Sequence, residues 1–251
     1  MGGQRPRPHA ETSRGRHYLG PRFASELVRG FDIARDELVV EIGAGTGRLT
    51  RELVQVADVV VAIEVDPVLA KGLVGAGWAP SNLLVHRGDA LEAALPQSSF
   101  RVVGNVPFGI STALLRRFLE DERTTRADLI VQLELARKHA ASRGRVLSVL
   151  WGTAWHLRMR RRIPARRFHP APRVDAAWLS AVRRDVPLIP LDERREFERL
   201  VRRGFRHATR PLRTSLGVSR PTLRRACVDA EARAVDLAST EWARLFRAIE
   251  G

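Results

Sequence analysis

The sequence is poor in cysteine, in long apolar runs and in acidic residues, and the first two shortages exclude whole classes of protein. Its one cysteine, Cys227, can form no disulfide within the chain, which fits a reducing cytoplasm. The longest apolar run has five residues, Val59 to Ile63, whereas a membrane helix needs about 20. A single cysteine and seven scattered histidines give no spacing typical of a zinc site. We therefore expect a cytoplasmic protein with no metal and no membrane segment.

The rest of the composition is that of a globular protein. Apolar residues make up 44 % of the 251 residues, enough for one large or two modest domains with real cores. Residues 1–16 are rich in arginine, glycine and proline and contain no apolar stretch. We predict that they form a flexible basic arm and not a secretory signal.

The scarcity of acidic residues leaves the chain strongly positive. Forty-three lysines and arginines against 28 acidic residues give a net charge of +15, and all the basic residues except Lys71 and Lys138 are arginine. Such a balance predicts a polyanionic partner, most often nucleic acid. A genome of high GC content would also enrich arginine, but here the arginines are clustered as well.

Apolar strand-like segments alternate with helical ones from about Arg22 onward. Helices are predicted at 47–56, after Asp66-Pro67 and at 111–120, the proline being suited to a first helical position and the aspartate to the N-cap. Strands are predicted at 38–42, 59–65, 82–86, 100–103, 127–133 and 174–182. This alternation predicts an α/β fold with a parallel sheet covered on both faces.

The pattern becomes purely helical after Pro187 and Pro190. Apolar residues then recur at helical spacing, at Phe197, Leu200, Val201 and Phe205. We therefore predict three parts, the arm at 1–16, an α/β domain at 17–185 and a small helical domain at 186–251. Four tryptophans are predicted to pack in the core or between domains, namely Trp151, Trp155, Trp178 and Trp242.

A glycine-rich segment follows the first predicted strand and opens the first helix. It reads Glu41-Ile-Gly-Ala-Gly-Thr-Gly47. Glycines let the backbone turn tightly and approach a ligand, and the helix N-terminus adds free N–H groups. The second strand ends about twenty residues on, at Glu64, where a carboxylate can accept both ribose hydroxyls of an adenosine cofactor. The alternatives are a structural loop and a solvated carboxylate, and Asp66 is read as a helix cap.

The third strand ends at Gly88-Asp89-Ala90. An aspartate at the carboxyl edge of a sheet, beside the cofactor crevice, can accept a hydrogen bond from an adenine amino group. Read alone, Asp89 is equally typical of a turn next to glycine.

Asn105-Val106-Pro107-Phe108, after the fourth strand, is the most specific feature of the sequence. It places an amide oxygen, main-chain carbonyls and an aromatic ring at the carboxyl edge of the sheet. This set suits a flat base that carries an exocyclic amine, because Asn105 and a carbonyl can accept both amine hydrogens while Phe108 stacks on the ring. The structural alternative is an Asn-Pro turn with a buried phenylalanine.

Together these motifs resemble the rRNA adenine dimethylases, which use S-adenosylmethionine, and within them the Erm family of 23S rRNA methyltransferases. The resemblance extends from about Arg16 to Arg184 and includes Phe168-His-Pro-Ala-Pro-Arg-Val-Asp175. It implies a Rossmann-like methyltransferase domain with a small helical domain, acting as a monomer on 23S rRNA. It also implies resistance to macrolides, lincosamides and streptogramin B.

The resemblance assigns roles to particular positions. Catalytic roles would fall on Asn105, Val106, Pro107 and Phe108. Cofactor contacts would fall on His17, Leu19, Gly43, Ala44, Gly45, Glu64, Val65, Asp89, Ala90 and Asn105. His17 departs from the family pattern, in which a Gln-Asn-Phe-Leu-type segment supplies an asparagine, and Phe108 replaces a tyrosine found in many relatives.

RNA contacts are predicted for Phe168 and for two groups of arginines. Phe168 resembles a second aromatic expected to face the flipped adenine, although a phenylalanine before Pro170 is also typical of a core. One group precedes Phe168, and the other lies within 199–225, which holds nine arginines and no acidic residue. The candidates are Arg160, Arg161, Arg162, Arg166, Arg167, Arg206 and Arg210.

Three other functions share these motifs. A 16S rRNA dimethyladenosine transferase shares nearly all of them. A DNA adenine methyltransferase shares the Asn-Val-Pro-Phe segment but usually carries a separate sequence-reading domain. A non-catalytic nucleic-acid-binding descendant would have no need to keep Glu64, Asp89 and Asn105 together.

Overall fold

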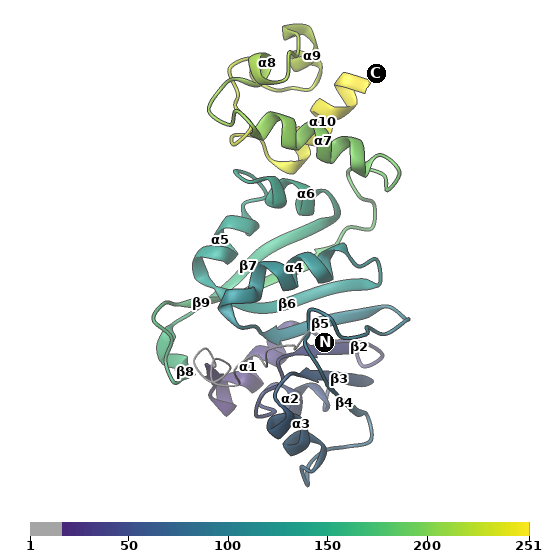
Figure 1. Cartoon of the computed structure of the whole chain (residues 1–251), viewed down its shortest axis with the longest axis vertical. Helices are drawn as coiled ribbons and strands as arrows, with labels where there is room; N and C mark the ends of the chain where they lie inside the picture. Colours follow the sequence, from purple (N-terminus) through teal and green to yellow (C-terminus); the bar gives the residue numbers. More distant parts are fainter. Residues whose placement is uncertain (1–16, 251) are drawn as a thin grey trace, which may run out of the picture. The chain divides into compact units, whose positions relative to one another are not determined.

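The computed structural model of the protein describes residues 17–250, so the predicted arm at 1–16 lies outside the described residues. The chain forms two compact units (Figure 1). The first runs up to Gln132 and includes Arg162–Ala176, and the second comprises Leu133–Arg161 and the chain from Ala177 onward. No helix among residues 17–250 is long and apolar enough to cross a membrane.

Five parallel strands form the centre of the first unit, in the order β4-β3-β2-β5-β6. They are β2 (Leu38–Ile42), β3 (Val59–Glu64), β4 (Leu83–Arg87), β5 (Phe100–Asn105) and β6 (Thr124–Gln132). The order reverses between β2 and β5, which flank the point where ligands bind in open α/β sheets. The predicted α/β class and parallel sheet are confirmed, as is a Rossmann-like arrangement.

One helix precedes the first of these strands, and three follow β2, β3 and β5 at the expected places. They are α1 (Pro21–Phe31), α2 (Thr50–Leu53), α3 (Pro67–Val74) and α4 (Ser111–Glu120). The Asp66 side chain accepts hydrogen bonds from the backbone N–H groups of Val68 and Leu69, at 2.8 and 3.3 Å, so its predicted role as N-cap is confirmed. The helix predicted at 47–56 is much shorter, because turns occupy both ends of that segment before β3 begins.

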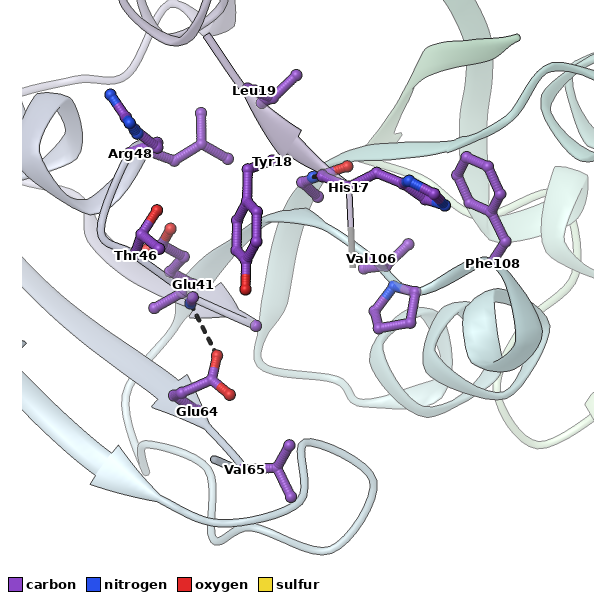
Figure 2. A pocket seen from close by; sticks show the side chains of 16 residues that line it. His17, Tyr18, Leu19, Glu41, Thr46, Arg48, Glu64, Val65, Val106 and Phe108 are labelled. Atoms are coloured by element: carbon purple, nitrogen blue, oxygen red, sulfur yellow. Dashed lines mark hydrogen bonds between the residues drawn. The ribbon is translucent and has the colours of Figure 1, made fainter. Parts of the chain in front are cut away.

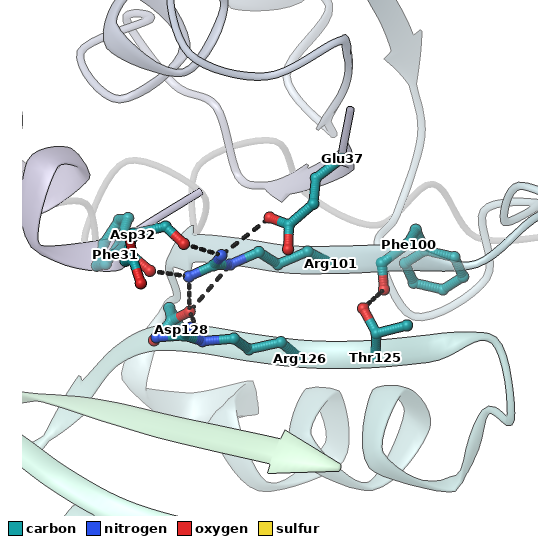
Figure 3. Close-up of polar contacts among 8 residues, drawn as sticks. All are labelled: Phe31, Asp32, Glu37, Phe100, Arg101, Thr125, Arg126 and Asp128. Carbon is teal, nitrogen blue, oxygen red and sulfur yellow. Dashed lines mark hydrogen bonds and ion pairs between the residues drawn. The ribbon is translucent and has the colours of Figure 1, made fainter. Parts of the chain in front are cut away.

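A buried arginine ties the end of α1 to the sheet (Figure 3). The Arg101 side chain on β5 is fully buried and pairs with Asp128 on β6, its Nη2 lying 2.6 Å from Oδ2. Its Nη1 donates to Glu37 at 2.9 Å, and the guanidinium also donates to the main-chain carbonyls of Phe31 and Asp32. A buried charge is tolerated only when it is paired and hydrogen-bonded in this way.

Two very short strands pair at a distance in the sequence. They are β1 (Tyr18–Leu19) and β8 (Phe168–His169), which run antiparallel with Leu19 opposite Phe168. The backbone N–H of Gly20 also donates to the carbonyl of Arg167 at 3.4 Å. The segment before α1 is thereby joined to a segment about 150 residues later.

The second unit is mainly helical. Its helices are α5 (Leu133–Ala140), α6 (Val146–Ala154), α7 (Arg194–Phe205), α8 (Leu212–Ser215), α9 (Arg220–Arg225) and α10 (Ser239–Glu250). Neighbouring strands β9 (Ala176–Arg183) and β7 (Trp155–Ile163) belong mostly to it. Phe197, Leu200 and Val201 are buried in a cluster that includes Trp242 and Phe246, and the half-buried Phe205 packs against it.

The division into compact units differs from the boundary predicted near Val186. Helices α5 and α6 and most of β7 and β9 lie with the C-terminal helices, so the purely helical segment after 186 is only part of the second unit. The three-part division by sequence, at 1–16, 17–185 and 186–251, remains a prediction. All four tryptophans predicted to pack inside, Trp151, Trp155, Trp178 and Trp242, are buried.

Candidate active site

One pocket of the first unit lies where β2, β3 and β5 end (Figure 2). Its lining brings together most of the residues predicted to bind a cofactor or a base. Those residues are His17, Leu19, Gly43, Ala44, Gly45, Glu64, Val65, Asn105, Val106, Pro107 and Phe108. The carboxyl ends of parallel strands meet at one edge of the sheet, which explains why motifs far apart in the sequence converge here.

The glycine loop forms one wall of the pocket. Gly43 and Gly45 have φ angles of 67° and 57°, a left-handed conformation that favours glycine. A Cβ atom on Gly45 would lie only 3.1 Å from the Tyr18 ring. The loop therefore needs glycine at this position for its backbone angle and for the close approach of Tyr18.

Glu64 is held rigidly beside this loop. It is buried, and its Oε2 accepts a hydrogen bond from the Gly45 N–H at 2.7 Å (Figure 2). Its Oε1 accepts one from the Asp66 N–H at 2.9 Å. Each carboxylate oxygen can accept more than one hydrogen bond, so these contacts fix the group while leaving acceptor capacity for a ligand.

Glu41 is a second carboxyl group in the same pocket and is only 1 % exposed. Its Oε2 has no hydrogen-bond partner among residues 17–250. Burial raises the pKa of Glu41 to about 7. Hydrogen bonding by Thr50 opposes this rise in the pKa, and the nearby charge of Glu64 adds to it. A buried polar atom without a partner points to a missing donor.

Asn105 ends β5 and lines the pocket. It is half-buried, and its Nδ2 donates a hydrogen bond to the main-chain carbonyl of His17 at 2.6 Å. Pro107 follows, and Phe108 begins the short helix η1 (Phe108–Ile110). The half-buried Phe108 ring lies beside the His17 ring, with their centroids 6.0 Å apart (Figure 2).

Three of the residues predicted to bind the cofactor or the base do not line this pocket, namely Asp89, Ala90 and Phe168. Asp89 accepts a hydrogen bond from the Leu91 N–H at 2.9 Å, so its carboxylate closes a turn after β4. Phe168 is 5 % exposed, and its backbone pairs with that of Leu19. A cofactor role for Asp89 and Ala90 and a stacking role for Phe168 remain predictions.

Five lining residues were not among the sequence predictions, namely Tyr18, Glu41, Thr46, Arg48 and Leu49. Glu41 and Thr46 lie within the glycine motif, and Arg48 and Leu49 follow it directly. Including the whole motif and the two residues after it would have found all four. Tyr18 lies between two predicted residues. Its ring reaches into the pocket because the following residue, Leu19, is buried in the pairing with β8 (Figure 2).

Several arginines predicted to contact RNA already have partners within their own unit. The Arg160 guanidinium lies over the Trp178 ring at 5.8 Å, and that of Arg167 lies over the Phe23 ring at 5.0 Å. Arg162 donates to Asp175 at 2.7 Å. The hydrogen bond from the Ala165 N–H, together with this contact, lowers the pKa of Asp175. Roles for Arg161, Arg166, Arg206 and Arg210 in RNA binding also remain predictions.

Residues 9–250 match the family model for ribosomal RNA adenine dimethylases. The chain belongs to this family. The mycinamicin-resistance protein MyrB of Micromonospora griseorubida is 34 % identical, with 93 % of this chain and 78 % of that protein covered. A ribosomal RNA small subunit methyltransferase A of Myxococcus xanthus is 32 % identical over 96 % of this chain and 91 % of its own length.

A solved structure agrees with this assignment. The crystal structure of the 23S rRNA methyltransferase ErmE superposes with a TM-score of 0.84 at 29 % identity, covering 93 % of this chain and all of that one. Membership of the family identifies the chain as an rRNA adenine methyltransferase with S-adenosylmethionine as its cofactor.

The pocket fits this cofactor on three observations. The glycine loop lets a ligand approach the loop backbone closely, and Glu64 supplies a fixed carboxylate for the ribose hydroxyls of the cofactor. The unpartnered Oε2 of Glu41 offers an acceptor for a cationic group, of which this cofactor has two, an ammonium and a sulfonium. No group of three or more metal-ligating side chains occurs in the described part of the chain.

Proposed function

We propose that this protein methylates N6 of an adenosine in 23S rRNA and thereby confers resistance to macrolides, lincosamides and streptogramin B. The observation that carries the proposal is the convergence of Asn105–Phe108 with the glycine loop and Glu64 on one pocket. The family match and the likeness to ErmE and MyrB support the choice of substrate. We further propose that the protein acts as a monomer in the cytoplasm.

The target adenosine has to leave its stack, because its amino nitrogen is shielded within a helix. Phe108 lies at the pocket, half-buried, and offers a stacking surface for the extruded base. Stacking of a base on an aromatic side chain is worth about 1–3 kcal/mol, which offsets part of the cost of unstacking. Phe168 would add a second surface only if it became accessible.

The adenine amine is a weak nucleophile because its lone pair is delocalised into the ring. Asn105 Oδ1 accepts one amine hydrogen, since its Nδ2 is occupied by His17. The Pro107 carbonyl already accepts hydrogen bonds from Ile110 N–H and Ser111 Oγ, at 3.2 and 3.1 Å. We therefore assign the second acceptor to the main-chain carbonyl of Val106.

These two acceptors favour a pyramidal nitrogen whose lone pair points at the methyl group. When bound, S-adenosylmethionine supplies a methyl carbon already activated by the positive sulfur. Asn105 and the Val106 carbonyl would hold the amine nitrogen for methylation by the bound cofactor, and the amine proton would leave to water. The residues of the chain act by positioning and polarising, without a covalent intermediate.

The test is transfer of labelled methyl from S-adenosylmethionine to protein-free 23S rRNA, 16S rRNA and duplex DNA in parallel, with the modified nucleoside identified. N6-methylated adenosine in 23S rRNA alone is the expected result, and it also distinguishes monomethylation from dimethylation.

A 16S rRNA dimethyladenosine transferase is the second candidate, favoured by the 32 % identity to the small-subunit enzyme. Label in 16S rRNA alone would establish it, and label in DNA alone would refute an RNA target. Cofactor binding without transfer to any of the three would instead favour a non-catalytic descendant.

A further inference from the structure

A short segment of the chain, His17–Leu19, lies across the pocket, and we call it the strap. All three of its residues line the pocket, and two of them pair with β8 as strand β1. Its contact with Asn105 joins residues 88 positions apart. The strap therefore connects the residue assigned to the target amine with a distant part of the first unit.

The hydrogen bond from Asn105 to the strap fixes which way the Asn105 amide faces. A side-chain amide has a donating and an accepting end, whereas a main-chain carbonyl only accepts. The 2.6 Å contact with the His17 carbonyl therefore requires the Nδ2 end of Asn105 to face the strap. The Oδ1 end is left for another partner, and an amide turned the other way would place two oxygen atoms against each other.

The side chain of the same strap residue makes two further contacts. The His17 Nδ1 lies 2.8 Å from the Pro170 carbonyl, to which it donates a hydrogen bond. Its ring lies against Phe108, with an interplanar angle of 38° (Figure 2). Because Pro170 follows β8 directly, this bond and the β1–β8 pairing hold the strap at the same place.

We propose that His17 is a positioning residue for methyl transfer: its main-chain carbonyl orients the amide of Asn105, and its ring, held by Pro170, supports Phe108. This rests on the proposed function and assigns to His17 a role toward the target base in place of a side-chain contact with the cofactor. Both groups that receive the adenine would thus be set by one residue before the base arrives.

The orientation of Asn105 can be measured without any substrate. The chain contains only two asparagines, Asn82 and Asn105, so labelling asparagine side chains with ¹⁵N gives two NH₂ signals. Asn105→Ala assigns them by removing one. Asn82 donates to the carbonyls of Val54 and Ala57, at 3.1 and 3.2 Å, and is the internal reference.

An ester in place of the peptide bond between His17 and Tyr18 tests the carbonyl itself, because an ester carbonyl is a weaker acceptor. We expect the Asn105 NH₂ signals to shift while those of Asn82 stay in place, and kcat to fall about threefold. Unchanged Asn105 signals in the ester protein would overturn the role of the carbonyl.

His17→Ala and His17→Asn test the ring. The alanine variant should lose about tenfold in kcat with little change in cofactor affinity, since the strap loses its bond to Pro170. The asparagine variant should recover only part of kcat, because its Nδ2 can restore the bond to Pro170 but it has no ring to support Phe108. His86→Ala is the matched control, an exposed histidine of the same unit outside the pocket.

A loss of cofactor affinity in His17→Ala that matches its loss of kcat would show a cofactor contact and refute the positioning role. Equal kcat for the alanine variant and the wild type would refute it as well. If the amide signals behave as expected but no RNA is methylated, the proposed function fails while the contact stands.

Discussion

Replacing Glu41 with glutamine should change how the stability of the protein depends on pH. Burial raises the pKa of Glu41 from an ordinary value of 4.5 to about 7. At about 1.4 kcal/mol for each tenfold change in proton affinity, this pKa difference corresponds to about 3 kcal/mol. Because the side chain is 1 % exposed, solvent screening reduces this figure little.

The sign follows from the direction of the shift. A carboxyl group whose pKa is higher in the folded chain binds its proton more tightly there, so its protonation favours folding. This contribution is complete below about pH 4.5 and is lost as the pH rises through about 7. Glutamine keeps the shape of the side chain and remains neutral. Between about pH 5 and pH 8, the free energy of unfolding of Glu41→Gln should therefore rise by up to about 3 kcal/mol relative to that of the wild type.

Urea unfolding of the cofactor-free protein, followed by tryptophan fluorescence at both pH values, measures this difference. The contributions of most other titrating groups cancel in the difference between the two proteins, because both proteins contain those groups. Glu92→Gln is the control, since Glu92 is exposed and lies outside the pocket. A stability difference between Glu41→Gln and wild type that stays the same at both pH values would refute a proton on buried Glu41.

Three further predictions concern the site, the core and the surface. Asn105→Ala should abolish methyl transfer while sparing most of the cofactor affinity, measured by calorimetry beside the transfer assay, and wild-type turnover would contradict its role. Arg101→Ala should lower the free energy of unfolding by about 3–5 kcal/mol, because Asp128 is left buried without its main partner. A loss of less than about 1 kcal/mol in the free energy of unfolding, measured with urea, would argue against this. RNA affinity should fall steeply with salt, by about one log–log slope unit for each phosphate contact, and a flat response in filter binding would show that the arginines make no such contacts.

The part of the site that could be predicted depends on local sequence and on one rule of topology. The glycine loop, Glu64 and Asn105 each follow a recognisable strand, and parallel strands place their carboxyl ends together. The pairing of neighbouring strands in the sheet fixes the distances between the motifs, so these distances did not have to be known beforehand. The fold class and this convergence were therefore accessible from the sequence.

The strap and the buried charges were not accessible in the same way. Strand β1 has two residues, and its partner β8 follows about 150 residues later, so no periodic pattern marks either one. The bond between Asn105 and His17 depends on that pairing. Likewise Arg101 interrupts an apolar strand, and only the tertiary structure shows that Asp128 and Glu37 surround it.

The pocket contains acidic groups although the chain as a whole is strongly positive. The chain carries a net charge of +15, which suits RNA, yet the pocket contains the carboxyl groups of Glu41 and Glu64. Among residues 17–250, Arg48 is the one arginine in its lining, and its side chain is exposed. A cationic cofactor and a polyanionic substrate require opposite fields, and charge in a buried pocket is screened less by salt than charge on surface arginines. Added salt should therefore weaken RNA binding much more than cofactor binding, and equal weakening of both would contradict this separation.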